Sequence, residues 1–206
     1  MAPKVTEQYR KEKRASILEA ALDCFVEKGF QATSVDDIVR RSGMSKGALY
    51  GYFSSKEEMY IDLAHSRMDE MAEIVHGPFS QLNGATAKIK SLFARFRNQP
   101  LTDLRKWLAF HLEFMVYISR NPELIGMHSN YRDKGLGLVG RLLAEGKASG
   151  EFRSDLDETA ASYIFWSVRD GLAVNFMLGG DEEEYKRILD RMEEMLLRHL
   201  RKEPLR

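Results

Sequence analysis

A short segment near the N-terminus concentrates residue types that suit contact with phosphate groups. Its polar or small members are Ser45, Lys46, Gly47, Tyr50 and Tyr52. An ammonium group attracts phosphate oxygens, a glycine lets a backbone approach closely, and a tyrosine hydroxyl can donate a hydrogen bond to phosphate. Lys56, a few residues later, adds a second ammonium group. The alternative is that the tyrosines only pack a small helical hairpin, as we expect of Phe53.

Capping residues around this segment predict two short helices joined by a tight turn. A Ser or Thr oxygen accepts a hydrogen bond from the first helical turn, and a carboxylate three residues later strengthens the cap. Two pairs fit the start of the first helix, Thr33 with Asp36 and Ser34 with Asp37. Gly43 tolerates the left-handed backbone beyond a helix end, and Ser45 can cap the second helix. The pattern predicts a helix-turn-helix over about residues 34–53.

A helix-turn-helix of this kind can read double-stranded DNA. Its second helix lies in the major groove, where its N-terminal residues reach base edges while flanking groups hold phosphates. We therefore expect DNA contacts from Thr33, Ser34, Ser45, Lys46, Gly47, Tyr50, Tyr52 and Lys56. Net charge adds no support, because 31 basic residues balance 31 acidic ones. Any electrostatic attraction to DNA must be local.

The first fourteen residues are locally basic, with five basic and two acidic side chains. This composition predicts a flexible arm that could follow phosphates or enter a minor groove. A solvated terminus with no partner is the alternative.

The rest of the chain is expected to be helical. Beyond Tyr60, apolar residues recur every three or four positions without the alternation typical of strands. Six further helices are predicted at about 56–76, 85–98, 102–119, 122–148, 155–178 and 182–201. Thr102 is expected to cap the third of these, and Ser154 with Asp157 the fifth. The result is an all-α fold of about nine helices, with domains over residues 1–58 and 59–206.

One helix face in the second domain has the composition of a small-molecule pocket, mainly apolar with a few polar groups. Trp107, His111, Phe114 and Met115 lie on this face, and Tyr131, Phe165, Trp166, Arg169, Asn175 and Phe176 could close the pocket from neighbouring helices. A histidine in such a place can instead be an ordinary core residue. Arg169 and Asp170 fit either an internal salt bridge or the polar end of the pocket.

The sequence gives no support for a metal site, a disulfide framework, a membrane span or catalysis. The four remaining histidines, His65, His76, His128 and His199, lack metal-ligand spacing. Cys24 is the single cysteine, so no disulfide framework or thiolate metal site is expected. The charged N-terminus and the lack of an apolar run near the ~18 residues of a membrane span predict a cytoplasmic protein. We expect no catalytic residues, no bound metal, no cofactor and no membrane association.

Gly135, Gly137 and Gly140 match the GxGxxG pattern of dinucleotide-binding sites. That pattern needs a preceding strand within a βαβ unit, and here it lies in a helical region. The three glycines predict instead a bend, a break or a close helix crossing, hypothetically beside the pocket.

Many positions within residues 13–60 match one pattern without gaps. They are Ile17, Ala20, Ala21, Phe25, Gly29, Phe30, Ala32, Thr33, Ser34, Ile38, Gly43, Ser45, Lys46, Gly47, Leu49, Tyr50, Tyr52, Phe53, Lys56 and Glu57. This block, about a quarter of the chain, resembles the N-terminal DNA-binding domain of the TetR family of bacterial repressors. Gly51 departs from the pattern, because family members commonly carry a larger residue there.

The resemblance implies a ligand-responsive repressor that is released from a palindromic operator by a small apolar or amphipathic effector. It also implies a homodimer formed through the last two helices, at about 155–178 and 182–201, which are rich in apolar residues. Ordinary packing within one chain would also account for those residues. The rival interpretation is a helical protein that binds lipids or small molecules, or an adaptor whose helix-turn-helix contacts other proteins.

Overall fold

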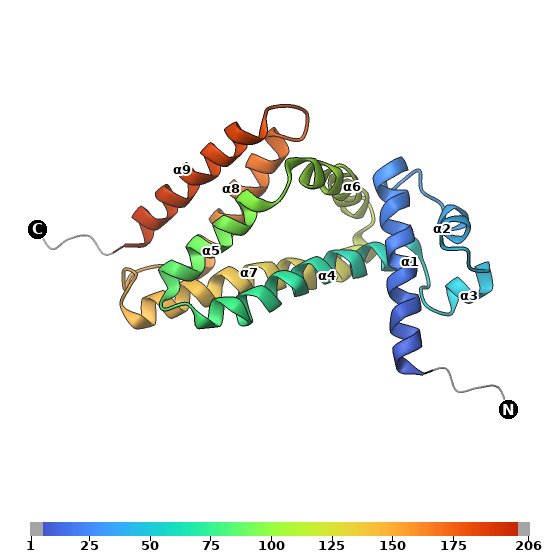
Figure 1. Ribbon diagram of the computed structural model, residues 1–206, viewed down its shortest axis with the longest axis horizontal. Helices are drawn as coiled ribbons and strands as arrows, with labels where there is room; N and C mark the ends of the chain where they lie inside the picture. The colour runs from blue at the N-terminus through green and yellow to red at the C-terminus, as the bar shows by residue number, and fades with distance from the viewer. Residues whose placement is uncertain (1–5, 202–206) are drawn as a thin grey trace, which may run out of the picture. The chain divides into compact units, whose positions relative to one another are not determined.

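The computed structural model describes residues 6–201, apart from the side chains of residues 71, 74–76, 78, 80, 127, 128, 130 and 131. These residues form α1 (Glu7–Lys28), α2 (Val35–Ser42), α3 (Lys46–Tyr50), α4 (Lys56–His76), α5 (Ala85–Asn98), α6 (Leu101–Ser119), α7 (Ile125–Ser149), α8 (Glu158–Asn175) and α9 (Glu182–Leu200), with 3-10 helices η1 (Pro78–Gln81) and η2 (Pro122–Leu124) (Figure 1). The all-α prediction is confirmed. Within this described part, no helix has the length and apolar character needed to span a bilayer.

The helices form two compact units. Unit 1 combines the chain up to Arg67 with Ala109–Ser129, and unit 2 combines Met68–Leu108 with the chain from Asn130 onward. Helices α4, α6 and α7 therefore each contribute residues to both units. The boundary predicted after residue 58 differs from this grouping, because aromatic side chains from α4 and α6 pack with those of α1 inside unit 1.

Both ends of α2, in unit 1, have the caps that the sequence predicts. The Ser34 side chain accepts a hydrogen bond from the Asp37 backbone and the Asp37 side chain accepts one from the Ser34 backbone, which completes a capping box. Of the two predicted pairs, Ser34 with Asp37 is therefore the one that begins α2. Gly43 follows α2 with φ 66°, in the left-handed region, as expected.

The start of α1 corrects one expectation. Thr6 caps α1, and residues 7–14 are helical, so the prediction of a flexible arm is wrong for them. Residues 1–5 lie outside the described part of the chain. A regular apolar spacing explains the helix, because its buried residues are Ile17, Ala20, Ala21, Cys24 and Phe25.

Unit 2 has its own apolar core, to which α5, α6, α7, α8 and α9 all contribute. Two predicted caps in it were wrong. Helix α6 begins at Leu101, before Thr102, and α8 is capped by Asp157 alone, whose side chain accepts from the Ala160 backbone. Helix α8 also ends earlier than expected, at Asn175.

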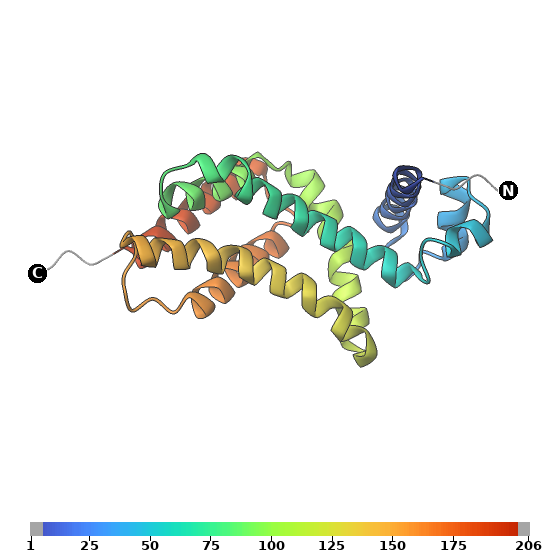
Figure 2. The same ribbon diagram turned by 90° about the horizontal axis from the view of Figure 1, so that it is seen from below.

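The glycine-rich stretch of α7 does not break the helix. In Figure 2, where its colour runs from yellow-green to gold, α7 is uninterrupted. Instead, α8 approaches closely: the Trp166 indole Nε1 donates to the Gly135 carbonyl at 2.9 Å. A Cβ on Gly140 would lie 3.4 Å from the Ser162 hydroxyl. Of the three predicted possibilities, the structure therefore has the close helix crossing.

Gly146, near the end of α7, is required by packing. An added Cβ would overlap the buried Phe152 ring and would lie 2.9 Å from the Ala85 Cβ. We expect Gly146→Ala to lower the free energy of unfolding by about 1–3 kcal/mol, because overpacking outweighs alanine's better helix propensity. Urea unfolding followed by circular dichroism, at one protein concentration, measures this change.

Gly137→Ala in the same helix is the matched control. Its added Cβ would meet only the Arg141 guanidinium, at 3.5 Å. Helix propensity should then dominate and stabilise the protein by up to about 1 kcal/mol. Equal effects of the two substitutions would contradict the packing argument.

Candidate nucleic-acid interface

Helix α3 presents one face to solvent and anchors the other in unit 1. Leu49 is fully buried, whereas Lys46, Gly47 and Tyr50 are exposed. The Ser45 hydroxyl accepts from the Ala48 backbone at 3.3 Å and so begins the helix. An added Cβ on Gly47 would have no neighbour within 4 Å, so the backbone there is open to a close approach. These four predicted contact residues, Ser45 to Tyr50, share one exposed surface.

The charged group on this surface already has a partner. The Lys46 Nζ lies 2.8 Å from an Asp36 carboxylate oxygen in the first turn of α2. Both side chains are more than half exposed, at 56% and 61%. The hydrogen bond to the carboxylate raises the pKa of Lys46, so its ammonium stays protonated.

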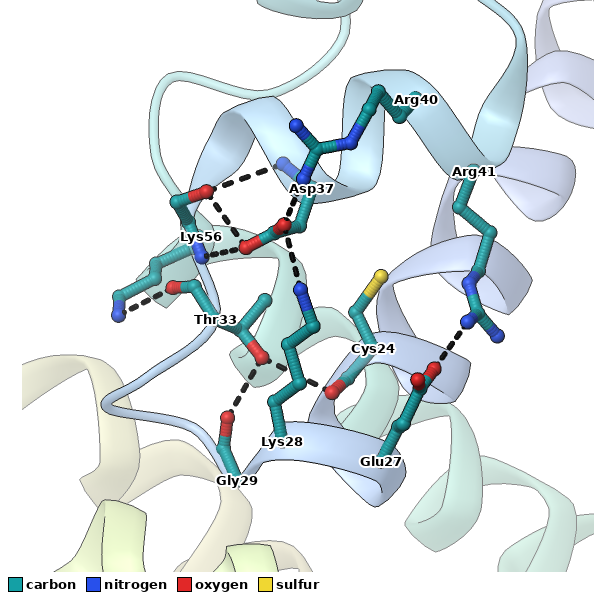
Figure 3. Close-up of polar contacts among 10 residues, drawn as sticks. Cys24, Glu27, Lys28, Gly29, Thr33, Asp37, Arg40, Arg41 and Lys56 are labelled. Carbon is teal, nitrogen blue, oxygen red and sulfur yellow. Dashed lines mark hydrogen bonds and ion pairs between the residues drawn. The ribbon is translucent and has the colours of Figure 1, made fainter.

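Thr33 does not belong to the exposed surface. Its side chain is buried, and its hydroxyl lies 2.7 Å from the Gly29 carbonyl and 3.0 Å from the Cys24 carbonyl, which share its single proton (Figure 3). The hydroxyl therefore links the end of α1 to the start of α2. Its predicted contact with DNA is corrected, because burial leaves this side chain no surface for phosphate.

Lys56 is also engaged by the protein. Its ammonium donates to the carbonyls of Phe30 at 2.8 Å, Gln31 at 3.1 Å and Thr33 at 2.8 Å, the last shown in Figure 3. Burial lowers the pKa of this amine. Because an ammonium group has three protons, these acceptors use its whole donor capacity. The arrangement favours a structural role over the phosphate contact that the sequence suggested.

The same turn between α1 and α2 is held from α6 by a carboxylate. Glu113 accepts hydrogen bonds from the backbone N–H of Phe30 at 2.6 Å and of Gln31 at 3.1 Å. Lys56 and Glu113 thus bind the carbonyl and amide groups of one turn from two different helices. Sequence reasoning missed Glu113, although a carboxylate among the apolar residues of the predicted 102–119 helix was a usable signal.

Helix α2 is fixed onto α1 by ion pairs. The Asp37 carboxylate binds Lys28 Nζ at 2.7 Å and also pairs with Arg40 (Figure 3). The Lys28 hydrogen bond, reinforced by those from Ser34, holds the pKa of Asp37 well below its usual range. Arg41, from the last turn of α2, pairs with Asp23 at 3.3 Å and with Glu27.

The end of α3 is positioned by an arginine of α1. Arg14 donates to the Tyr52 carbonyl at 2.8 Å and to the Asp62 carboxylate at 2.9 Å, and its guanidinium lies 4.0 Å from the Phe53 ring centre. Tyr52 itself is half-buried. Gly51 is exposed with φ −71°, a conformation open to any residue. Gly51 therefore leaves its backbone uncovered at the position where the resemblance predicts a larger residue.

The predicted pocket residues do not gather in either unit alone. His111, Phe114 and Met115 belong to unit 1, whereas Trp107, Phe165, Trp166, Arg169, Asn175 and Phe176 belong to unit 2. The Tyr131 side chain lies outside the described residues. In unit 1, the His111 Nδ1 is hydrogen-bonded to the Tyr60 hydroxyl, and the Phe114 ring stacks on Tyr60 with ring centres 3.6 Å apart. His111 and Phe114 are therefore part of the packing of unit 1.

Arg169 shows one of the two arrangements expected for it. Its guanidinium pairs with Asp170 at 2.9 Å and lies 5.1 Å from the Phe96 ring centre in unit 2. Among the described residues, nothing accepts a hydrogen bond from its buried Nε. The salt bridge is therefore present, although the Asp170 side chain is exposed, and the Arg169 Nε is a buried donor at the same place. Asn175, by contrast, is exposed at the end of α8.

Comparison with known proteins agrees with this geometry. The family model "Bacterial regulatory proteins, tetR family" matches residues 17–63. The HTH-type transcriptional regulator YfiR of Bacillus subtilis is 31% identical over 184 residues, which cover 89% of this chain and 89% of YfiR. The chain belongs to the TetR family. It is a DNA-binding transcriptional regulator, as its helix-turn-helix predicted.

Two further proteins resemble this TetR-family member over most of its length. The transcriptional repressor AcnR of Corynebacterium diphtheriae is 27% identical over 182 residues, which cover 88% of this chain and 90% of AcnR. The crystal structure of the regulator FadR from Bacillus subtilis, in complex with stearoyl-CoA, has the same fold. It matches with a TM-score of 0.72 and 19% identity, over 90% of this chain and 98% of FadR.

Replacing Lys56 separates its two possible roles. Lys56→Met keeps most of the aliphatic side chain but leaves three carbonyls without their charged donor. We expect the free energy of unfolding to fall by about 1–3 kcal/mol. The slope of log affinity against log salt, measured on duplex DNA, should not change, because no phosphate contact is lost.

Lys106→Met is the control for this substitution, because Lys106 is exposed on α6. Its effect on stability should stay within about 0.5 kcal/mol. A Lys56→Met protein of unaltered stability whose salt slope falls by about one unit would instead establish the phosphate contact.

Proposed function

We propose that the exposed face of α3 is the DNA-reading surface of a dimeric repressor that an amphipathic small molecule releases from a palindromic operator. The observation that carries this proposal is the position of Lys46 and Tyr50, both exposed on a short helix whose opposite side is fixed by Leu49. A short helix held rigidly in this way can enter the major groove. The AcnR relative, named as a repressor, supports this sign of control.

Each α3 residue would have a distinct task in such a complex. Lys46 and Tyr50 would bind phosphates or base edges, and Gly47 would let the backbone approach the duplex. Ser45 would remain as the cap, with its hydroxyl turned toward the helix N-terminus. Ser34, which is exposed beside Asp37 at the start of α2, and the half-buried Tyr52 would add phosphate contacts at the edges of the surface.

The proposed dimer interface is the exposed apolar face of α8 with part of α9. Large apolar side chains are exposed there: Tyr163, Ile164, Val168 and Val174 on α8, Leu178 just beyond its end, and Met195 on α9. Ile164 and Val168 lie one helical turn apart, and Tyr163 and Val174 lie three turns apart, so the four α8 side chains cover one broad side of the helix. A second copy of the chain would cover them in a four-helix bundle. Two α3 helices would then have to lie about 34–36 Å apart, or at a multiple of that spacing, to enter successive major grooves.

The proposed effector would bind among the aromatic residues of unit 2. Trp107, Phe165, Trp166 and Phe176 supply apolar surface there, and Arg169 supplies a cationic group. The bound stearoyl-CoA of the FadR structure, a long acyl chain with a charged head, is the class of molecule that such a set would suit. As a DNA-binding regulator, the protein would act in the cytoplasm, where bacterial DNA lies.

Release of DNA would depend on a difference in affinity. Helices α4, α6 and α7 all run between unit 2 and unit 1, so a change in unit 2 has three covalent connections to the unit that carries the helix-turn-helix. The effector can release DNA only by as much as it prefers the state that does not bind DNA. By linkage, operator DNA must weaken effector binding by the same factor.

The DNA contact is tested with Lys46→Ala in the full-length protein. Gel shifts on the DNA that flanks its own gene, repeated between about 50 and 200 mM salt, should show weaker binding and a salt slope smaller by about one unit. Lys106→Ala, which removes the same charge from an exposed site on α6, should leave both unchanged. Unchanged affinity of Lys46→Ala would contradict the proposed interface.

The dimer is tested by placing a charge on the apolar face of α8. Val168→Glu should convert the dimer to monomers at micromolar concentration, because a buried carboxylate with no partner is costly. Sedimentation velocity measures the mass directly. The control Ala148→Glu adds the same charge at an exposed position in the last turn of α7 and should remain dimeric. A dimeric Val168→Glu protein would place the interface elsewhere.

A further inference from the structure

Every cation between residues 28 and 62 has a partner within the protein. The acidic partners are Asp37 for Lys28 and Arg40, Asp23 and Glu27 for Arg41, and Asp36 for Lys46, while Lys56 binds three backbone carbonyls. All five cations join one element of unit 1 to another or strengthen a helix start. The Lys46–Asp36 pair differs from the other ion pairs because both of its side chains are more than half exposed.

This pair is not explained by stability. Ion pairs between exposed side chains contribute little to folding, and α3 is already fixed by Leu49 and by its Ser45 cap. Helix α2 likewise has a complete capping box without Asp36. The Asp36 carboxylate therefore needs an explanation other than stability, and its position beside the exposed face of α3 indicates one.

We propose that Asp36 holds Lys46 in the free protein and competes with DNA phosphates for it, which weakens association with DNA of arbitrary sequence. This proposal rests on the proposed contact between Lys46 and DNA. Non-specific binding comes almost wholly from phosphate contacts, each of which releases counterions. When Lys46 leaves Asp36 for a phosphate, the carboxylate loses its partner a few ångströms from a polyanion, well inside the Debye length of about 10 Å.

The penalty is a similar free energy on both kinds of DNA, but its consequence differs. At the operator, base contacts from the other α3 residues add to the phosphate contacts and keep binding strong despite the loss of the ion pair. At arbitrary sequence there are no such contacts, so the same loss weakens an association that is already weak. Asp36 thus suppresses non-specific association, and it does so with one placed carboxylate in a protein whose net charge is zero.

The test compares Asp36→Asn with the wild-type full-length protein on a DNA duplex of arbitrary sequence, between about 50 and 200 mM NaCl. Freed from its partner, Lys46 should bind phosphate more readily, so affinity at the lowest salt should rise about 3- to 10-fold and the salt slope should steepen by up to one unit. Affinity for the protein's operator should rise by a similar factor, because the same ion pair is broken in both complexes. Asp36→Glu keeps the charge and should behave like the wild type.

Two controls isolate the ion pair from bulk charge. Asp23→Asn removes an equally exposed carboxylate that pairs with Arg41, and it should change non-specific affinity less than twofold. In a Lys46→Ala background, Asp36→Asn should lose most of its effect. Thermal unfolding of each variant checks that the folded fraction is the same, and Asp36→Ala provides a second variant if the asparagine variant unfolds.

Three outcomes would overturn the proposal. They are no gain for Asp36→Asn, an equal gain for Asp23→Asn, and an undiminished gain in the Lys46→Ala background, which would mean that Asp36 repels phosphate without involving Lys46. Failure of the DNA contact itself is recognised separately, because Lys46→Ala alone would then leave affinity unchanged.

Discussion

The turn between α1 and α2 has backbone amide and carbonyl groups that find no hydrogen-bond partner within either helix. Side chains from α4, α6 and the turn itself supply these partners. Buried amide and carbonyl groups without partners are costly, so a tight turn in a packed domain needs donors and acceptors from elsewhere. Lys56 supplies the donors from α4, Glu113 supplies the acceptors from α6, and the Thr33 hydroxyl binds the end of α1. The position of α2, and through it of α3, follows from this set of bonds.

Aromatic packing strengthens the same junction. Phe30 lies in the turn and contacts both Tyr60 of α4 and Phe114 of α6, with ring centres 5.7 and 4.8 Å apart. Phe25 of α1 packs against Phe110 at 5.9 Å. Polar and apolar contacts thus join the same three helices, so a displacement of α4 or α6 must act on the turn that carries α2 and α3. Coupling between an effector and DNA would pass through these contacts.

The helix-turn-helix was predictable because its capping residues act on their neighbours in the sequence. Contacts between residues far apart in the sequence were not predictable. Ser34, Gly43 and Ser45 act within a few residues of their own position, and their roles could be inferred from neighbouring letters of the sequence. Glu113 and Phe30 are 83 residues apart, and nothing local indicates that a carboxylate on one helix will bind the amides of a distant turn. The role of Thr33 was misjudged and the bonds of Lys56 were not foreseen for the same reason, because a polar residue near a DNA-binding motif can serve the fold as well as the ligand. For His111 the sequence left two alternatives, a pocket contact or an ordinary core residue, and its neighbour Tyr60 could not be identified from spacing alone.

The division of α6 between the two units limits how this protein can be taken apart. A fragment that ends at Arg67 retains every residue of the helix-turn-helix but loses Glu113, Phe110 and Phe114. Its α1–α2 turn would then lack its acceptors, and Phe25 and Phe30 would lose aromatic cover. A hybrid repressor made by exchanging the DNA-binding unit between relatives therefore needs residues 109–119 and the N-terminal segment from the same protein. The residues that the DNA-binding unit needs in order to fold are thus discontinuous in the sequence, although its helix-turn-helix motif is continuous.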